Sequence, residues 1–420
     1  MIIIHMMDDL PSYLPRLASG LVRRALEVSP VVVLMGARQT GKTTLVRSEV
    51  ALDGPEDRLY LTLDDLSVRE RARAQPEDLV RSAPLLTLAE VQREPDLILA
   101  IKGAVDADRP RRPGRFLLTG SANLLLMQRI SESLAGRATY VTLWPLTHRE
   151  KLGLGRAGLW DELLSRPVDE WYDLVRGQEV PSADWRSEAC IGGYPTPAVE
   201  LGTADSRSVW FDGYVRTYLE RDLQDLASID NLIDFRRLMR ATCLRLGNLM
   251  NQAEMGRDVQ LPRTTVHRYL NLLETSYQLV RLEPYSVNRT KRLVKSPKLF
   301  WSDPGLALHL AQEEAGGAHL ENLVLHDLLA WRDSQIPRPE VLFWRTSTGV
   351  EVDLVIEHPG GLLPIEVKAT RNPGRNAVRG LEAFRDEYPD QVTGGLLLHG
   401  GEETQWISRN ILAAPWHRVV

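Results

Sequence analysis

The amino-acid sequence predicts a multidomain α/β protein, and three observations support this prediction. The chain has 420 residues, which is long enough for roughly two to four domains of ordinary size. Short apolar segments alternate with helix-length intervals in its first part, a pattern typical of a parallel sheet covered by helices. With 43% hydrophobic and 25% charged residues, the composition is close to the globular average. We therefore exclude a disordered chain, a collagen-like fibre and a coiled-coil rod.

Residues 1–160 are expected to form the first α/β domain. Its candidate strands are short apolar runs at residues 31–35, 58–63, 85–88 and 115–119. A Trp-rich stretch and a strongly helical segment follow, so residues 161–230 are expected to be a helical connector. Several helices and two strand-like segments predict a separate unit at residues 231–312, and helix and strand patterns predict a second α/β unit at residues 313–420.

Charge, cysteine content and hydropathy restrict the setting of the protein. The chain has 51 Lys and Arg against 56 Asp and Glu, and a net charge of -5 does not exclude a local basic face that binds nucleic acid. Cys190 and Cys243 have no short spacing, so neither a disulfide framework nor a structural zinc site is expected. The start lacks a basic signal-peptide region, and no apolar run approaches the roughly 18 residues that span a bilayer. We expect a cytoplasmic protein that does not contact membranes.

A phosphate-binding loop is predicted directly after the first apolar strand. Residues 36–43 match the pattern G-x-x-x-x-G-K-[ST], in which backbone N–H groups surround phosphate, the lysine contacts the β- and γ-phosphates, and the hydroxyl binds Mg²⁺. The expected cofactors are ATP and Mg²⁺, with Thr43 as a metal ligand. The expected nucleotide contacts are Gly36, Ala37, Arg38, Gln39, Thr40, Gly41, Lys42, Thr43 and Thr44. The alternative is a glycine turn followed by an unrelated lysine.

A second part of a nucleotide site is predicted at residues 85–92, with the sequence Leu-Leu-Thr-Leu-Ala-Glu-Val-Gln. Here the chain resembles the AAA-type ATPases of bacteria and archaea that have a C-terminal nuclease-like domain. The resemblance implies that Glu90 is the catalytic base. It also shows a departure, because Ala89 occupies the position of the magnesium-associated Asp. This difference affects the expectation of hydrolysis more than that of nucleotide binding, since Lys42 and Thr43 are present.

The resemblance extends through residues 116–123, which look like a sensor strand, and through Arg137. It implies that Ser121 positions the attacking water and that Arg137 neutralises charge on the γ-phosphate. The alternatives are a strand-ending serine and a solvated surface charge. An arginine of this kind acts between subunits only in an oligomer, so the role is compatible with a homo-oligomer. A further hypothesis is that Asp64 and Asp65 partly replace the missing carboxylate.

Residues 231–312 are predicted to form a winged helix, because helices precede two strand-like segments. Apolar residues recur at helical spacing within 263–274 and are expected to be buried: Val266, Tyr269, Leu270 and Leu273. The opposite face offers residue types that contact phosphates and base edges: Arg263, Thr264, His267, Arg268 and Asn271. A basic loop at residues 288–295 adds Arg289, Lys291 and Arg292 where a wing would lie. The pattern predicts DNA binding; the alternative is a docking module between domains.

Two strands joined by a Pro-Gly-Gly turn are predicted at residues 350–357 and 362–368. The simplest register pairs Glu357 with Leu362, and therefore Asp353 with Glu366 and Glu351 with Lys368. Two carboxylates that face each other across a ladder repel unless a cation lies between them. The hairpin therefore predicts a metal site.

The spacing of Asp353 from Glu366 and Lys368 resembles the PD-(D/E)xK signature of restriction-endonuclease-like folds. The resemblance implies that Asp353 and Glu366 hold Mg²⁺ and that Lys368 orients or activates the attacking water. It also implies that Glu321, on the preceding helix, completes the metal site. The alternatives are a strand edge with mixed surface charges, or a fold without activity.

Two functions are consistent with these patterns. The first is an AAA-type ATPase that acts on DNA and controls a Mg²⁺-dependent nuclease-like domain. The second is a nucleotide-binding regulatory or scaffold protein that binds DNA or a protein partner without cleaving it.

Overall fold

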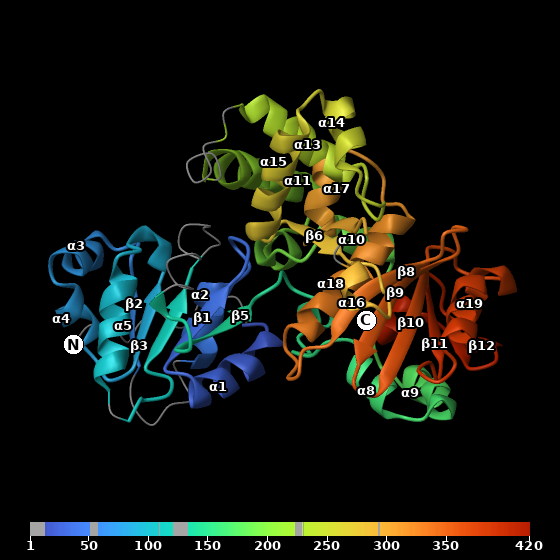
Figure 1. Ribbon diagram of the computed structural model, residues 1–420, viewed down its shortest axis with the longest axis horizontal. Coiled ribbons are helices and arrows are strands. Elements are labelled where there is room, and N and C mark those ends of the chain that lie inside the picture. The colour runs from blue at the N-terminus through green and yellow to red at the C-terminus, as the bar shows by residue number, and fades with distance from the viewer. Residues whose placement is uncertain are drawn as a thin grey trace. The chain divides into compact units, whose positions relative to one another are not determined.

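The computed structural model describes residues 13–50, 58–108, 110–120, 133–222, 229, 231–292 and 295–420. The chain folds into two compact units. The described residues up to 143, together with 149–156, belong to the first unit, and residues 144–148 and 157–420 belong to the second (Figure 1).

The first unit contains a five-stranded sheet in the order β2-β3-β4-β1-β5, and every recorded pair in it is parallel. Its strands are β1 (Val31–Met35), β2 (Leu59–Thr62), β3 (Leu86–Ala89), β4 (Phe116–Thr119) and β5 (Ala138–Thr142). Its helical segments are α1 (Ala18–Val28), α2 (Lys42–Leu45), η1 (Val46–Val50), α3 (Leu66–Ala74), α4 (Pro76–Val80), η2 (Val91–Arg93) and α5 (Leu97–Ala107). The predicted parallel α/β sheet is thus confirmed.

The core of this unit explains why the first strand is a continuous apolar run. All five residues of β1 are buried, and Val32 and Leu34 pack with Val22 and Ala25 of α1. Adjacent strand residues point to opposite faces, so a strand buried along its whole length must be covered on both sides. The short helix α7 (His148–Lys151) lies mostly in this unit, which includes residues 149–156.

The second unit begins with helical segments that pack against its C-terminal part. These are α8 (Trp160–Ser165), η3 (Val168–Glu170), α9 (Trp171–Arg176), α10 (Trp185–Ile191), η4 (Thr196–Glu200), α11 (Ala204–Tyr214) and η5 (Val215–Asp222). Asp327 accepts hydrogen bonds from the Trp160 indole at 2.6 Å and from the Gly158 backbone at 3.0 Å. The Trp416 indole donates to the Ala183 carbonyl at 3.3 Å. The segment expected to be a connector is therefore an integral part of this unit.

Three helices and an antiparallel strand pair occupy the middle of the second unit. They are α13 (Leu232–Cys243), α14 (Gln252–Val259), α15 (Arg263–Thr275), β6 (Leu279–Leu282) and β7 (Lys298–Trp301), with the helical turn α16 (Arg289–Arg292) between the strands. The predicted loop at residues 288–295 is wrong in this respect, because its first half is helical. The helix α17 (Pro304–Ala311) follows.

The C-terminal part is a mixed six-stranded sheet in the order β12-β13-β11-β10-β9-β8. Its strands are β8 (Glu340–Arg345), β9 (Glu351–His358), β10 (Gly361–Lys368), β11 (Gly395–His399), β12 (Gln405–Ser408) and β13 (Ile411–Pro415). Its helices are α18 (Gly317–Arg332), η6 (Arg375–Val378), α19 (Arg379–Glu387) and α20 (Trp416–Val419). Figure 1 shows α18 and α19 on opposite sides of this sheet.

The register predicted for the C-terminal hairpin is confirmed where the strands pair regularly. Glu357 lies opposite Leu362, and the pairing runs from His358 and Gly361 to Leu354 and Ile365. At Asp353, a carboxylate oxygen accepts a hydrogen bond from the Val367 backbone at 2.9 Å. This hydrogen bond draws the Asp353 side chain to the end of β10.

Burial on β4 leads to a stability prediction. Leu118 is fully buried in β4, which lies between β1 and β3, whereas Leu99 on α5 is 63% exposed. Leu118→Ala should lower the free energy of unfolding by about 3 kcal/mol, because it removes buried apolar contacts and leaves a cavity. Leu99→Ala, the matched control, should change it by less than about 0.5 kcal/mol. Urea unfolding followed by circular dichroism measures both; equal effects would contradict the described burial.

Candidate functional site

The phosphate-binding loop lies between β1 and α2, as predicted. Gly36, Gln39 and Gly41 have positive φ angles of 146°, 62° and 92°, which curl the loop tightly before the helix begins at Lys42. A Cβ atom on Gly36 would lie 2.2 Å from the carbonyl oxygen of Leu143, so only glycine fits there. The loop therefore has the backbone shape that the sequence motif requires.

The Lys42 side chain is held inside the loop. Its ammonium group donates hydrogen bonds to the carbonyl oxygens of Gly36 at 3.2 Å and Ala37 at 2.6 Å. Burial lowers the pKa of Lys42 to about 8, while the nearby Glu90 carboxylate acts in the opposite direction. Lys42 is thus positioned to exchange these carbonyl contacts for phosphate oxygens.

Two buried charged residues, Arg16 and Glu150, hold the phosphate-binding loop in place. The sequence did not identify either of them. The guanidinium of Arg16 donates to the Thr40 carbonyl at 2.8 Å and to the Glu150 carboxylate at 3.1 Å. The same carboxylate accepts from the Leu17 backbone at 2.7 Å. Both charged side chains are buried, with 5% and 3% exposure. Because these residues are distant in sequence from the motif, no local pattern indicates their role.

Glu90 directly follows β3, at the same edge of the parallel sheet as the loop that follows β1. Its φ angle of 59° lies in the left-handed region, which is uncommon for residues other than glycine. The Gln92 amide donates to the Glu90 carboxylate. Ala89 is 1% exposed and offers no carboxylate, as its identity in the sequence requires.

Among the other residues predicted for the nucleotide site, Arg137, Asp64 and Asp65 contact protein groups of their own. Ser121 lies outside the described residues. The Arg137 guanidinium forms two hydrogen bonds with the Asp106 carboxylate, at 2.7 Å and 3.0 Å. Asp64 pairs with Arg93, and Asp65 caps α3 by accepting from the Ser67 backbone. Since β2 is separated from β1 by β3 and β4, the structure gives no support to Asp64 and Asp65 as replacements for the missing carboxylate.

The residues of the loop fit a nucleotide and one metal contact. The curled backbone and the Lys42 ammonium match a polyphosphate. Thr43 is the second residue of α2, and its side chain is half-buried. The remaining predicted contacts share this loop: Arg38 is half-buried, Gln39 and Thr44 are exposed, and Thr40 is buried. Thr43 would be the protein ligand of Mg²⁺ in this unit.

The helix α15 has the two faces that its sequence predicts. Val266, Tyr269, Leu270 and Leu273 are buried. Arg263, Thr264, His267 and Arg268 are exposed. Two of these positions have neighbours on the helix: His267 contacts the Asn271 amide at 3.1 Å, and the Arg268 guanidinium lies 5.2 Å from the centre of the Tyr269 ring.

The prediction that Arg292 contributes to an exposed basic face is wrong. This side chain is 5% exposed and forms ion pairs with the carboxylates of Glu340 and Glu357. It also donates to the Ser286 carbonyl at 2.8 Å. Arg289 is exposed but contacts Glu357 at 3.4 Å, and the Lys291 side chain lies outside the described residues. Arg292 therefore belongs to the interior of its unit and is unavailable to phosphates.

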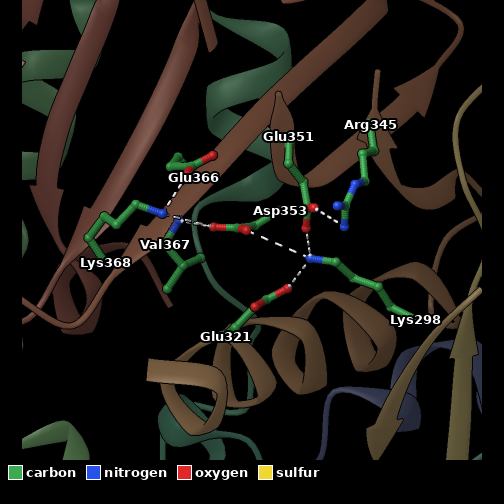
Figure 2. A network of polar contacts seen from close by, with 8 residues as sticks. All are labelled: Lys298, Glu321, Arg345, Glu351, Asp353, Glu366, Val367 and Lys368. Carbon is green, nitrogen blue, oxygen red and sulfur yellow. Dashed lines mark hydrogen bonds and ion pairs between the residues drawn. The ribbon is translucent and has the colours of Figure 1, made fainter. Parts of the chain in front are cut away.

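The predicted C-terminal acidic residues come together with two lysines (Figure 2). Lys368 contacts the carboxylates of Glu366 and Asp353, the latter at 3.6 Å. Glu321 projects from α18 toward the same place, as the resemblance implied. Burial raises the pKa of the Glu321 and Glu366 carboxyls, and the Asp353 carboxylate raises both further.

Lys298 was not predicted to be part of this site. Its ammonium lies 3.1 Å from a Glu321 oxygen and 3.7 Å from an Asp353 oxygen, and it also pairs with Glu351. Arg345 contacts the same Glu351 carboxylate at 3.2 Å. The only sequence signal is a lysine at the start of an otherwise apolar strand, Lys298-Leu-Phe-Trp, which is insufficient to identify a partner 55 residues away.

The C-terminal residues do not fit a resident divalent cation. Carboxylates are suitable Mg²⁺ ligands, and Glu366 Oε2 is buried with no hydrogen-bond partner among the described residues. However, Lys298 lies among three of the four carboxylates, and Lys368 contacts the fourth. Within the described part of the chain, no group of three or more His, Cys, Asp or Glu side chains has a metal-holding arrangement. The expected metal roles of Glu321, Asp353 and Glu366 are therefore not supported.

The sequence predicts no segment that spans a bilayer, and the described helices bear on this prediction. Across the described residues, no helix has both the length and the apolar character that a bilayer-spanning segment needs.

Comparison with protein families divides the chain into three parts. Residues 28–152 match an AAA domain, residues 182–316 match a domain of unknown function (DUF8612), and residues 316–419 match another (DUF4143). The AAA match covers the phosphate-binding loop, Glu90 and Arg137, which were assigned to an ATPase by their motifs.

Relatives that match over most of their length occur in bacteria. Uncharacterized proteins of Mycobacterium tuberculosis and Mycobacterium bovis are each 32% identical over 415 residues, covering 96% of this chain and 84% of theirs. An uncharacterized protein of Haemophilus influenzae is 22% identical over 315 residues, covering 71% and 74%.

Solved structures are more distantly similar. A Walker-type ATPase of Pyrococcus abyssi has 18% identity and a TM-score of 0.45, covering 73% of this chain and 99% of its own. AMPPCP-bound DnaA from Aquifex aeolicus has 15% identity and a TM-score of 0.25, covering 62% and 87%. On the domain match and the mycobacterial identity, the chain belongs to the same family as these mycobacterial proteins, a family with an N-terminal AAA domain of the P-loop ATPase type.

Proposed function

We propose that this protein binds ATP with Mg²⁺, hydrolyses it slowly, and acts on DNA without cleaving it. The observation that carries the proposal is the complete phosphate-binding loop, in which a buried Lys42 ammonium is held on two loop carbonyls near the Glu90 carboxylate. Such a loop offers both oriented N–H groups and a mobile cation to a polyphosphate.

The residues of the loop would divide the work of binding. Lys42 would leave the carbonyls of Gly36 and Ala37 and contact the β- and γ-phosphates, while Thr43 would hold Mg²⁺. When bound, Mg²⁺ supplies charge neutralisation on the phosphate oxygens. Glu90 would accept a proton from the attacking water. Slow turnover is expected because Ala89 lacks the carboxylate that fixes the metal in related ATPases.

We further propose that residues 231–312 form a winged helix that contacts DNA through α15. Support comes from the order of three helices and an antiparallel strand pair, and from the exposed Arg263, His267 and Arg268 on one face of α15. Residues of these types contact phosphates and base edges. Arg292 has no part in this proposal.

The proposed role of residues 313–420 is to bind rather than to cut. Their PD-(D/E)xK-like arrangement is supported by the hairpin with Asp353, Glu366 and Lys368. Phosphodiester cleavage is not expected, because the residues around Asp353 do not fit a resident metal. Nucleotide-dependent regulation of DNA or of a bound protein is the function that this combination favours. A cytoplasmic location and a homo-oligomer stay predictions.

The nucleotide proposal predicts that one substitution removes ATP binding and that another raises ATP turnover. Lys42→Ala should abolish ATP binding measured by isothermal titration calorimetry, because the cation that contacts the phosphates is lost. Ala89→Asp should raise ATP turnover by about tenfold, equivalent to roughly 1.4 kcal/mol of barrier, because it restores a metal-associated carboxylate. Unchanged ATP binding in Lys42→Ala would sink the proposal, and unchanged turnover in Ala89→Asp would show that the missing carboxylate does not limit hydrolysis.

The DNA proposal predicts a change in salt dependence. Replacing Arg263 and Arg268 by Ala should weaken duplex binding and reduce the slope of log affinity against log salt by about two, because each arginine neutralises a phosphate. The matched control replaces Arg375 and Arg379, which are also exposed but lie before and on α19. Fluorescence anisotropy over a salt series measures both. If the α15 variant keeps the native affinity and slope, α15 is not the DNA-binding helix.

A further inference from the structure

The C-terminal acidic cluster consists of Glu321, Glu351, Asp353 and Glu366. The side chain of Lys298 enters it from the β6–β7 strand pair. Lys298 begins β7, which pairs with β6 through Leu282, whereas the carboxylates come from α18, β9 and β10. Its backbone also bridges Leu249. The strand pair therefore fixes the lysine Cα outside the six-stranded sheet, and the long side chain reaches inward until it is only 4% exposed.

The ammonium of Lys298 lies where a shared cation would be placed. It contacts one oxygen each of Glu321, Glu351 and Asp353, side chains from one helix and one strand. The face of the Phe343 ring lies 5.5 Å away and adds a favourable cation–π contact. Figure 2 shows the three carboxylates converging on this nitrogen from different directions.

The charges of the cluster nearly balance without a metal. Its acidic members are Glu321, Glu351, Asp353 and Glu366, and its cations are Lys298, Lys368 and Arg345. With every group ionised, one negative charge is in excess. A divalent cation added to this set would reverse the sign, whereas removal of the Lys298 ammonium would leave an excess of two negative charges that a divalent cation could neutralise.

We propose that Lys298 is the built-in cation of this cluster and lies among Glu321, Glu351 and Asp353 in place of a divalent metal. The lysine is covalently attached, so its three carboxylate partners are held together at any metal concentration, while Lys368 holds the fourth carboxylate, Glu366. A tethered ammonium has no open coordination position for water or a phosphate oxygen, so the cluster stabilises the fold instead of hydrolysing phosphodiesters.

The test measures Mn²⁺ binding to the nucleotide-free, DNA-free full-length protein by electron paramagnetic resonance. The native protein should show no saturable site that depends on Asp353, so that Asp353→Asn leaves its Mn²⁺ titration unchanged. Lys298→Ala should gain one Mn²⁺ site with a dissociation constant below about 1 mM, because carboxylate oxygens become available. The double variant Lys298→Ala/Asp353→Asn should lose the gained site.

Lys295→Ala is the matched control, because Lys295 is an exposed lysine three positions earlier in the sequence. It should titrate like the native protein. A Mn²⁺ site in the native protein that disappears in Asp353→Asn would overturn the proposal, since metal and lysine would then coexist. Absence of a new site in a folded Lys298→Ala variant would also overturn it.

If Lys298→Ala fails to fold, the comparison of the native protein with Asp353→Asn still decides, because it needs no change at Lys298. Plasmid cleavage by the native protein with Mn²⁺ that is lost in Lys368→Ala would equally count against a built-in cation. These readouts are independent of ATP turnover and of DNA affinity at α15, so their failure is distinguishable from failure of the proposed function.

Discussion

A buried charge is costly unless an opposite charge or a strong hydrogen bond meets it, and this requirement determines how both units are built. Under the phosphate-binding loop, Arg16 and Glu150 satisfy each other and fix the Thr40 carbonyl and the Leu17 backbone. In the second unit, Arg292 joins α16 to the strands of Glu340 and Glu357. The loop and the sheet edges have their observed positions because these pairs hold them.

The same requirement separates the two acidic features of the chain. Glu90 follows a strand at the open edge of a parallel sheet, is half-buried and has a positive φ, which keeps a carboxylate close to Lys42. Asp353 and its neighbours instead meet two lysines from different elements. Glu90 thus lies near the phosphate-binding lysine, whereas the C-terminal carboxylates form ion pairs that link strands and a helix.

Local patterns in the sequence predicted much of this structure. Continuous apolar runs identified β1, β3 and β4, because strands covered on both faces need no polar alternation. The run at residues 58–63 identified β2, and the glycines of residues 36–43 identified the loop. The turn at residues 358–361 fixed the register of β9 and β10 as far as Leu354 and Ile365, and the predicted pairs of Asp353 with Glu366 and of Glu351 with Lys368 lie beyond the recorded pairing. The buried stripe of α15 followed from its helical spacing.

Contacts between distant segments could not be predicted in this way. Arg292 has the same local sequence whether it is solvated or buried, and only the positions of Glu340 and Glu357 decide between these states. Lys298 is one of several basic residues near β7, and its partners depend on where β7 meets the sheet. The strands β5, β8 and β11 to β13 were not identified, although β11 and β13 are short buried runs of largely apolar residues.

The contact between Trp160 and Asp327 has a consequence for how the chain is made. These residues are 167 positions apart, and the backbone of Leu159 likewise donates to the carbonyl of Val419. During translation, the tryptophans of residues 160–185 leave the ribosome long before the C-terminal strands that bury them. Domains generally fold as units, so the second unit needs residues 327–420 before the helices at residues 160–191 can be fully packed. A chain that lacks residues 416–420 should therefore leave Leu159 and Ala183 without their hydrogen-bond partners Val419 and Trp416.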